Sequence, residues 1–361
     1  MKPFTLLRLV GFAAVAVART EVMLPLYTAP GGATPEPDWQ AAVDAIRNNP
    51  DMHFYVVINP NNGPRNTSFP GNPGSCNVWN EADNSDWIPH GCNKDWSTNV
   101  DILNQLPNVQ TLGYVYTRYG DTASRSIAEI EEDIAECVSR THPNFLTTTR
   151  TRHNSHPHSA SGRAWRDENT WTGRGNISIH GIWFDETGIS IGNRTEYTQL
   201  TDYARRVFDE KDPADRGLFS IVMNPGSNPD QDYEPHLFAM SDAVVVRETC
   251  WTEVGSVECP GNYVPFDVST LAPGSGLPHD DALRPKSVVL VHQVRDPPAA
   301  NNETLYEQIQ GVVGLGLHST YFTSAEWNVT TMLPASVGVV AEFLSRANNE
   351  AQGQGDGAKL V

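Results

Sequence analysis

Short apolar runs alternate with amphipathic segments along most of this chain. The apolar runs are rich in Val and Ile and predict buried strands. They cover Glu21–Thr28, Met52–Asn59, Val109–Thr117, Ile177–Phe184, Leu218–Asn224, Ala243–Arg247, Ser287–Val294 and Leu315–Tyr321. The segments between or after them carry apolar residues at helical spacing and predict helices. These cover Pro37–Arg47, Thr98–Gln105, Ser124–Arg140, Thr195–Glu210, Glu234–Met240, Glu303–Val313 and Pro334–Arg346.

This alternation of strands and helices predicts an α/β fold with parallel strands. Eight strand–helix units fit a (β/α)8 TIM-type barrel with long loop insertions, which we expect to form one domain over residues 20–347. A doubly wound open sheet is the alternative. It is less favoured because no Gly-rich phosphate-binding turn follows the first predicted strand.

Three segments are longer than a plain barrel requires: Asn61–Ser97, Thr141–Gly175 and Thr249–Lys286. The first and third follow strands, so we expect them on the face where barrel enzymes carry their active site. The second precedes a strand and should lie on the opposite face. The glycine-rich tail from Asn348 to the C-terminus is predicted to be disordered.

The first nineteen residues have the pattern of a secretory signal peptide. Lys2 and Arg8 give a basic start, and the apolar stretch Leu9–Ala18 is too short to span a bilayer. A buried N-terminal strand or helix is the alternative. No later segment reaches the length of a membrane span, so we expect a secreted protein that is extracellular or associated with a cell wall.

Cysteine usage and glycosylation sequons agree with secretion. Cys76 and Cys92 bracket one loop, and Cys250 and Cys259 bracket another, so two local disulfides are expected. Cys137 lies on the apolar face of a predicted helix, where we expect a buried thiol outside any disulfide. The acceptor asparagines of the five sequons are Asn66, Asn176, Asn193, Asn302 and Asn328.

The formal net charge of −18 argues against nucleic acid as a partner. A neutral or cationic substrate is compatible with it. We expect a monomer, and no Cys and His spacing suggests zinc or calls for a cofactor. A metal site at His153, His156 and His158 is an alternative, but a mobile polar loop is favoured there.

Carboxylates follow two of the predicted strands directly. Asp185 and Glu186 come after Ile177–Phe184, and Glu248 comes after the run that ends at Arg247. In a barrel these side chains meet at the C-terminal end of the strands, and paired carboxylates are what glycosidic bond hydrolysis requires. The other strand ends supply aromatic, amide and imidazole groups suited to sugars. These candidate substrate-binding residues are Tyr27, Asn59, Tyr114, Tyr116, Asn224, His292 and Tyr321.

Several of these strand ends resemble the spherulin-4 family of fungal and slime-mould surface proteins, which includes glycoside hydrolase family 135. The matching segments, in family order, are Leu24–Tyr27, Val57–Pro64, Gly113–Gly120, Gly181–Glu186 and Asn224–Gly226. The resemblance implies a (β/α)8 fold and endo-hydrolysis of α-1,4-linked N-acetylgalactosamine in galactosaminogalactan. It also implies that Asp185, Glu186 and Glu248 are the catalytic carboxylates.

Two functions therefore remain open. In the first, the protein is a secreted endo-glycosidase in which Asp185 is the nucleophile or base, Glu248 the general acid and Glu186 a residue that orients or tunes the pair. In the second, it is a non-catalytic carbohydrate-binding protein of a cell wall or spore surface that uses the same site. The carboxyl separation decides between retention and inversion, and the sequence does not give it.

Overall fold

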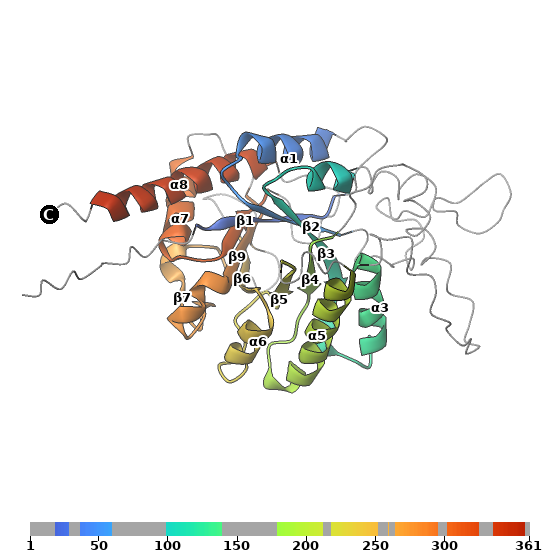
Figure 1. Cartoon of the computed structure of the whole chain (residues 1–361). Coiled ribbons are helices and arrows are strands. Elements are labelled where there is room, and N and C mark those ends of the chain that lie inside the picture. The colour runs from blue at the N-terminus through green and yellow to red at the C-terminus, as the bar shows by residue number, and fades with distance from the viewer. Residues whose placement is uncertain are drawn as a thin grey trace, which may run out of the picture.

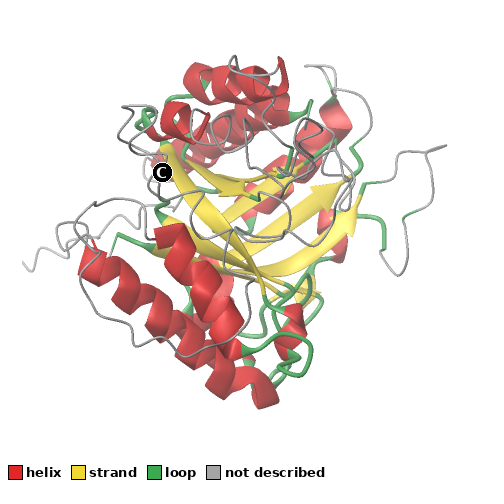
Figure 2. Ribbon diagram, turned by 90° about the vertical axis from the view of Figure 1, so that its right-hand side faces the viewer, coloured by secondary structure: helices red, strands yellow, loops and turns green. Residues whose placement is uncertain are grey.

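Eight parallel strands close into a barrel in the computed structural model, and helices surround it (Figures 1 and 2). This confirms the predicted (β/α)8 fold and excludes the open sheet. Around the barrel the strands follow the order β1-β10-β9-β6-β5-β4-β3-β2. The structure describes residues 19–28, 37–59, 99–138, 179–211, 218–251, 259, 264–294, 302–324 and 335–357.

Each barrel strand lies within or close to a predicted apolar run. The strands are β1 (Glu21–Leu26), β2 (Phe54–Ile58), β3 (Val109–Tyr116), β4 (Gly181–Asp185), β5 (Ser220–Asn224), β6 (Ala243–Cys250), β9 (Ser287–His292) and β10 (Ser319–Phe322). The helices are α1 (Pro37–Asn48), α3 (Ile127–Val138), α5 (Arg194–Lys211), α6 (Glu234–Met240), α7 (Glu303–Gly314) and α8 (Val337–Gly357), and residues 99–104 are also helical. Helix α7 packs beside α8, and α3 packs beside α5 (Figure 1).

The strands are mostly apolar because both of their faces are largely buried. In β4, Trp183 and Asp185 lie on one face and Ile182 and Phe184 on the other, since side chains alternate along a strand. All three apolar residues are completely buried. The face that carries Asp185 is the barrel interior, and the face that carries Phe184 packs against the surrounding helices.

A β-bulge in β6 determines which carboxylate of that strand faces the barrel interior. Val245 pairs with Val288 and Glu248 pairs with Leu290, with a register shift between Val245 and Arg247. Val288 and Leu290 lie on the same face of β9, so Val245 and Glu248 also share a face although they are three residues apart. Without the extra residue, Arg247 would point inward and Glu248 outward.

Several of the predicted strand boundaries were wrong by two or more residues. Strand β6 does not stop before Glu248 but continues to Cys250, because its pairing with β9 extends to His292. The last strand begins at Ser319 rather than Leu315, because Leu315 is still the C-cap of α7.

The predicted disordered tail is also incorrect, because α8 continues to Gly357. Asn348 is buried, and its side chain accepts a hydrogen bond from the backbone N–H of Thr20 and donates one to the backbone carbonyl of Thr20, both at 2.9 Å. These bonds join α8 to the start of the barrel.

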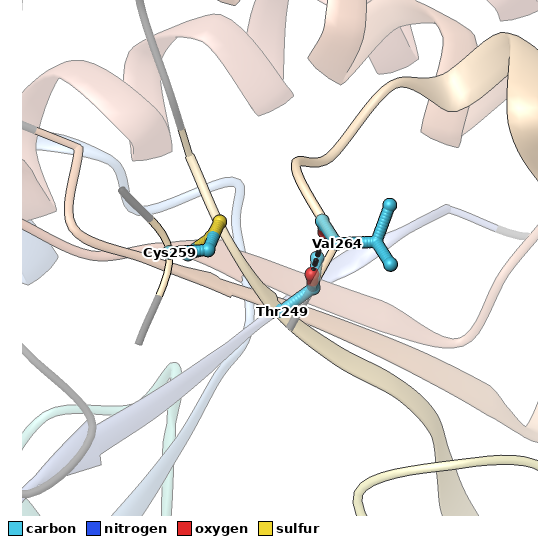
Figure 3. The surroundings of a disulfide bond; sticks show 4 residues. Thr249, Cys259 and Val264 are labelled. Carbon is cyan, nitrogen blue, oxygen red and sulfur yellow. Dashed lines mark hydrogen bonds between the residues drawn. A yellow bond between two sulfur atoms is a disulfide. The ribbon is translucent and has the colours of Figure 1, made fainter. Parts of the chain in front are cut away.

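The insertion after β6 is linked to the rest of the protein near its start and again at Leu277. Cys250 and Cys259 form the expected disulfide, and the Thr249 hydroxyl donates to the carbonyl of Val264 next to it (Figure 3). Further along, the Asn228 side chain donates to the carbonyl of Leu277 at 2.8 Å. The insertion is thereby held against the segment that follows β5.

Cys137 is buried in α3 and is not part of a disulfide, as expected. The signal segment, the insertions 61–97 and 141–175, and the sequons at Asn66, Asn176 and Asn328 lie outside the described residues, as do Cys76 and Cys92. Among the described helices, none is long and apolar enough to cross a membrane.

Candidate active site

Asp185 is the last residue of β4 and points into the C-terminal end of the barrel. Its Oδ2 accepts a hydrogen bond of 2.5 Å from the Tyr114 hydroxyl, and its Oδ1 accepts one of 2.6 Å from the side-chain amide of Asn224. Burial raises the pKa of Asp185, whereas these hydrogen bonds lower it. The donors therefore favour the ionised carboxylate at a site that otherwise disfavours charge.

Glu248 shares the amide of Asn224 with Asp185. The Asn224 nitrogen lies 3.3 Å from Oε2 of Glu248, so this oxygen and Oδ1 of Asp185 are at most about 6 Å apart. Burial and the negative charge of Asp185 raise the pKa of Glu248 to about 7, and the Asn224 hydrogen bond offsets part of this rise. The net effect is a raised pKa for both carboxyls, and the pKa of Glu248 is high enough for this carboxyl to be protonated in weakly acidic solution.

Glu186 follows Asp185 but is held by a different backbone conformation. Its φ is +50°, in the left-handed region that non-glycine residues rarely adopt. Oγ1 of Thr117 lies 2.9 Å from the carbonyl oxygens of both Asp185 and Glu186, which fixes the chain at this point. Burial raises the pKa of Glu186, and hydrogen bonding by Tyr116 lowers it. Side chains of neighbouring residues in a strand point to opposite faces, but β4 ends at Asp185 and Glu186 has left the strand conformation. Both carboxylates can therefore lie at the same site.

Aromatic rings border the carboxylates. The rings of Tyr27 and Tyr114 meet edge to face with centroids 5.6 Å apart. Burial raises the pKa of Tyr27, and the charges of Asp185 and Glu248 raise it further, so both carboxylates are near its hydroxyl. Tyr116 is partly buried, and the Arg125 guanidinium lies 5.7 Å from its ring centroid.

The remaining predicted binding residues are almost completely buried. Asn59 and His292 are each 3% exposed, and Tyr321 is 0% exposed. Burial lowers the pKa of His292 to about 4, so its imidazole is neutral at ordinary pH. Tyr321 pairs with Leu290, which is also the partner of Glu248, whereas His292 pairs with Cys250, two residues beyond Glu248 along β6. Tyr321 does not reach the surface.

Sequence reasoning missed two residues that position the carboxylates. Thr117 anchors the end of β4, as described above, and its hydroxyl is 3.0 Å from that of Tyr197. Gly226 has a φ of +70°, and its backbone carbonyl accepts a 2.9 Å hydrogen bond from the N–H of Glu248. The Asn-Pro-Gly sequence at 224–226 was a turn signal that could have identified Gly226. Within the described ranges, no group of three or more His, Cys, Asp or Glu residues could hold a metal ion.

The chain resembles known proteins along most of its length. The family model Spherulin4, described as spherulation-specific family 4, matches residues 21–76 and 80–340. Spherulin-4 of Physarum polycephalum is 21% identical over 228 residues, which are 63% of this chain and 44% of that protein. The chain thus aligns with less than half the length of this curated relative.

A solved structure shares the fold. The crystal structure of Aspergillus clavatus Sph3 in complex with GalNAc superposes with a TM-score of 0.53 at 20% sequence identity. The match covers 91% of this chain and 98% of Sph3.

Proposed function

The chain belongs to spherulation-specific family 4, and from this premise we propose that it is a glycoside hydrolase. Its substrate is an α-1,4-linked N-acetylgalactosamine or galactosamine polysaccharide, such as galactosaminogalactan, which it cleaves within the polymer. The GalNAc bound to the related Sph3 fold supports this sugar class. The charge of −18 is compatible with a neutral or partly deacetylated, cationic polymer.

The observation that carries this proposal is the pair of carboxyl groups bridged by Asn224. Glycosidases need one carboxyl that gives up a proton and one carboxylate that stabilises or attacks the anomeric carbon. Glu248, with a pKa of about 7, suits the first role. Asp185, which accepts hydrogen bonds from Tyr114 and Asn224, suits the second.

We infer a retaining mechanism, because Oδ1 of Asp185 and Oε2 of Glu248, which share the Asn224 amide, are at most about 6 Å apart. Retaining enzymes hold their carboxyls roughly 5 to 5.5 Å apart, whereas inverting enzymes leave roughly 6.5 to 9.5 Å for a water molecule. In the first step, an oxygen of Asp185 bonds to the anomeric carbon, the glycosidic bond breaks, and the proton of Glu248 passes to the leaving oxygen. In the second, Glu248 takes a proton from water, whose oxygen displaces Asp185.

Glu186 has a supporting role in this scheme. It lies next to Asp185 in the chain, and the charge of Asp185 contributes to raising its pKa. Tyr27, Tyr116 and Tyr114 supply ring faces and hydroxyls at the same end of the barrel. Secretion is part of the proposal, and the Cys250–Cys259 disulfide supports an oxidising compartment.

The test is incubation of the purified, secreted protein with galactosaminogalactan and with unrelated fungal exopolysaccharides. We expect new reducing ends, internal cleavage to oligosaccharides and, by NMR of the first product, an α anomer. A β anomer would exclude the retaining mechanism. Binding without any release of reducing ends would exclude hydrolysis and favour the carbohydrate-binding wall or spore-surface protein.

A further inference from the structure

Backbone strain is concentrated at one end of this barrel. The non-glycine residues with positive φ in the described part of the chain are Arg118, Tyr119, Glu186 and Gln293, and each follows the end of a barrel strand. Arg118, Tyr119 and Gly120 are consecutive, with φ values of 52°, 54° and 74°. This conformation is strained for a residue such as Tyr and persists only where surrounding contacts impose it.

Hydrogen bonds impose this conformation on Tyr119 from the side of the carboxylates. Its backbone N–H donates to the carbonyl of Glu186 at 2.5 Å, and the Asn193 side-chain amide lies 3.4 Å from its carbonyl oxygen. The loop after β3 is thereby tied to the residue next to Asp185. A displacement of one loop would displace the other.

The Tyr119 side chain is exposed although its backbone is fixed. It is 58% exposed and is the one aromatic among the large hydrophobic residues exposed in the described ranges. Ile189 and Ile191, exposed to 38% and 42%, lie in the adjacent loop after β4. The pKa of Tyr119 is raised to about 12, mainly by its partial burial. The negative charges of Glu186, Asp185 and Glu248 raise it further. The phenol therefore stands within electrostatic range of all three carboxylates.

We propose that the Tyr119 ring is a sugar-stacking platform, which binds a saccharide unit of the polymer beside the bond-cleaving carboxylates. This rests on the proposed function, since the occupant is a unit of that polysaccharide. An exposed, rigidly held ring offers an apolar face to the C–H side of a pyranose at little entropic cost, because its backbone is already ordered. In this proposal, the role of the strained backbone at positions 118–120 is to orient the Tyr119 ring, not to stabilise the barrel.

Three substitutions test this assignment. Tyr119→Asn removes the ring but keeps a residue that tolerates the left-handed conformation, and Tyr119→Phe keeps the ring. Leu218→Ala is the matched control, because Leu218 is 70% exposed and precedes β5 at the opposite end of the barrel. We expect Tyr119→Asn to raise KM for the polymer about tenfold with kcat within about twofold, while Tyr119→Phe and Leu218→Ala match the wild type.

Binding measurements separate this inference from the hydrolase proposal. Calorimetric titration of Asp185→Asn with an N-acetylgalactosamine oligosaccharide should show about tenfold weaker binding when Tyr119→Asn is added. Unchanged KM and unchanged binding in the Tyr119→Asn variant, with hydrolysis by the wild type intact, would refute the platform alone. No hydrolysis by the wild type, with binding that still depends on the Tyr119 ring, would refute the hydrolase and keep the platform. A kcat loss shared by Tyr119→Asn and Tyr119→Phe would also refute the platform, because it would show that the hydroxyl and not the ring is needed.

Discussion

The backbone N–H of Gly226 donates a 3.0 Å hydrogen bond to Oδ1 of Asn224 and so decides which way the Asn224 amide faces. With Oδ1 occupied, the amide nitrogen of Asn224 is turned toward the two carboxylates. Oxygen and nitrogen ends of an amide are told apart by their hydrogen bonds. Here the bond from Gly226 makes Asn224 a donor to Asp185 and Glu248.

Removal of this donor should move the pH–activity profile toward higher pH. The Asn224 hydrogen bonds lower the pKa of both Asp185 and Glu248, so Asn224→Ala should raise both values. We expect the two limbs of the kcat/KM profile to shift upward by on the order of one pH unit. Asn224→Asp, which places a third negative charge there, should shift them further. A profile that stays in place or moves to lower pH contradicts the bridging role.

Substitution of the carboxylates should lower turnover but leave the fold intact. Asp185→Asn and Glu248→Gln should each lower kcat about 10³-fold or more, and the double variant should be little worse, because the groups act as a unit. Glu186→Gln should lose about 10- to 100-fold, in keeping with a supporting role. Glu307→Gln, at an exposed position of α7, is the control and should retain full activity. Polymer hydrolysis and thermal melts check these outcomes, and near-wild-type activity of Asp185→Asn would show the assignment to be wrong.

The alkaline limb of the wild-type profile should lie near pH 7. Glu248 must be protonated to act as the acid, and its pKa in the folded protein is about 7. Activity should therefore be higher at pH 5.5 than at pH 8.5. A limb that lies beyond pH 9 would assign the acid to another group.

The same carboxyl should make stability depend on pH. The pKa of Glu248 rises from 4.5 to about 7 on folding, so its favourable contribution is fully present below pH 4.5 and is lost as pH rises through 7. Glu248→Gln avoids burying this charge and should stabilise the protein at pH 8 by up to about 3 kcal/mol. At pH 4 the variant and the wild type should melt alike. Chemical denaturation at both pH values measures the difference, and equal stabilities at pH 8 would contradict the raised pKa.

Two sequons should differ in occupancy. The Asn193 amide packs against Gly120 and Gly188 and reaches the carbonyl of Tyr119, so it lacks room for a glycan on its nitrogen. Asn302 uses its Oδ1 to cap α7 by accepting from the N–H of Leu305, and this bond would persist with a glycan on the nitrogen. We expect a glycan at Asn302 and none at Asn193 in protein secreted from a fungal host. Peptide mapping after enzymatic deglycosylation tests this, and a modified Asn193 contradicts it.

The cysteine pairing can be tested by peptide mapping under non-reducing conditions. We expect Cys76 to be bridged to Cys92, Cys250 to Cys259, and Cys137 to be in neither bridge. Loss of the second bridge in a Cys250→Ala/Cys259→Ala variant should destabilise the fold by about 2–3 kcal/mol, because the bridge closes a short loop. A peptide that joins Cys137 to another cysteine would refute this pairing.

The barrel architecture could be predicted from the sequence, and so could the strand ends at which the candidate carboxylates lie. A parallel barrel buries both faces of its strands, so each strand is an apolar run that hydrophobicity alone identifies, and Asp185 stands where such a run ends. The closing helix was underestimated because the glycines after Asn348 weaken helix propensity. The buried bonds between Asn348 and Thr20, which oppose this weakness, join residues far apart in the chain.

The geometry of the carboxylates, in contrast, depends on contacts that the sequence pattern does not show. Alternation along β6 would send Glu248 outward, and the bulge that reverses this shows only in the pairing of Arg247 and Glu248 with β9. The left-handed turns at Glu186 and Tyr119 likewise follow from hydrogen bonds between the loops after β3 and β4. Such conformations oppose local preference, and contacts distant in sequence impose them. A pattern read along the chain reports local preference, so it predicts the barrel but not the geometry at its C-terminal end.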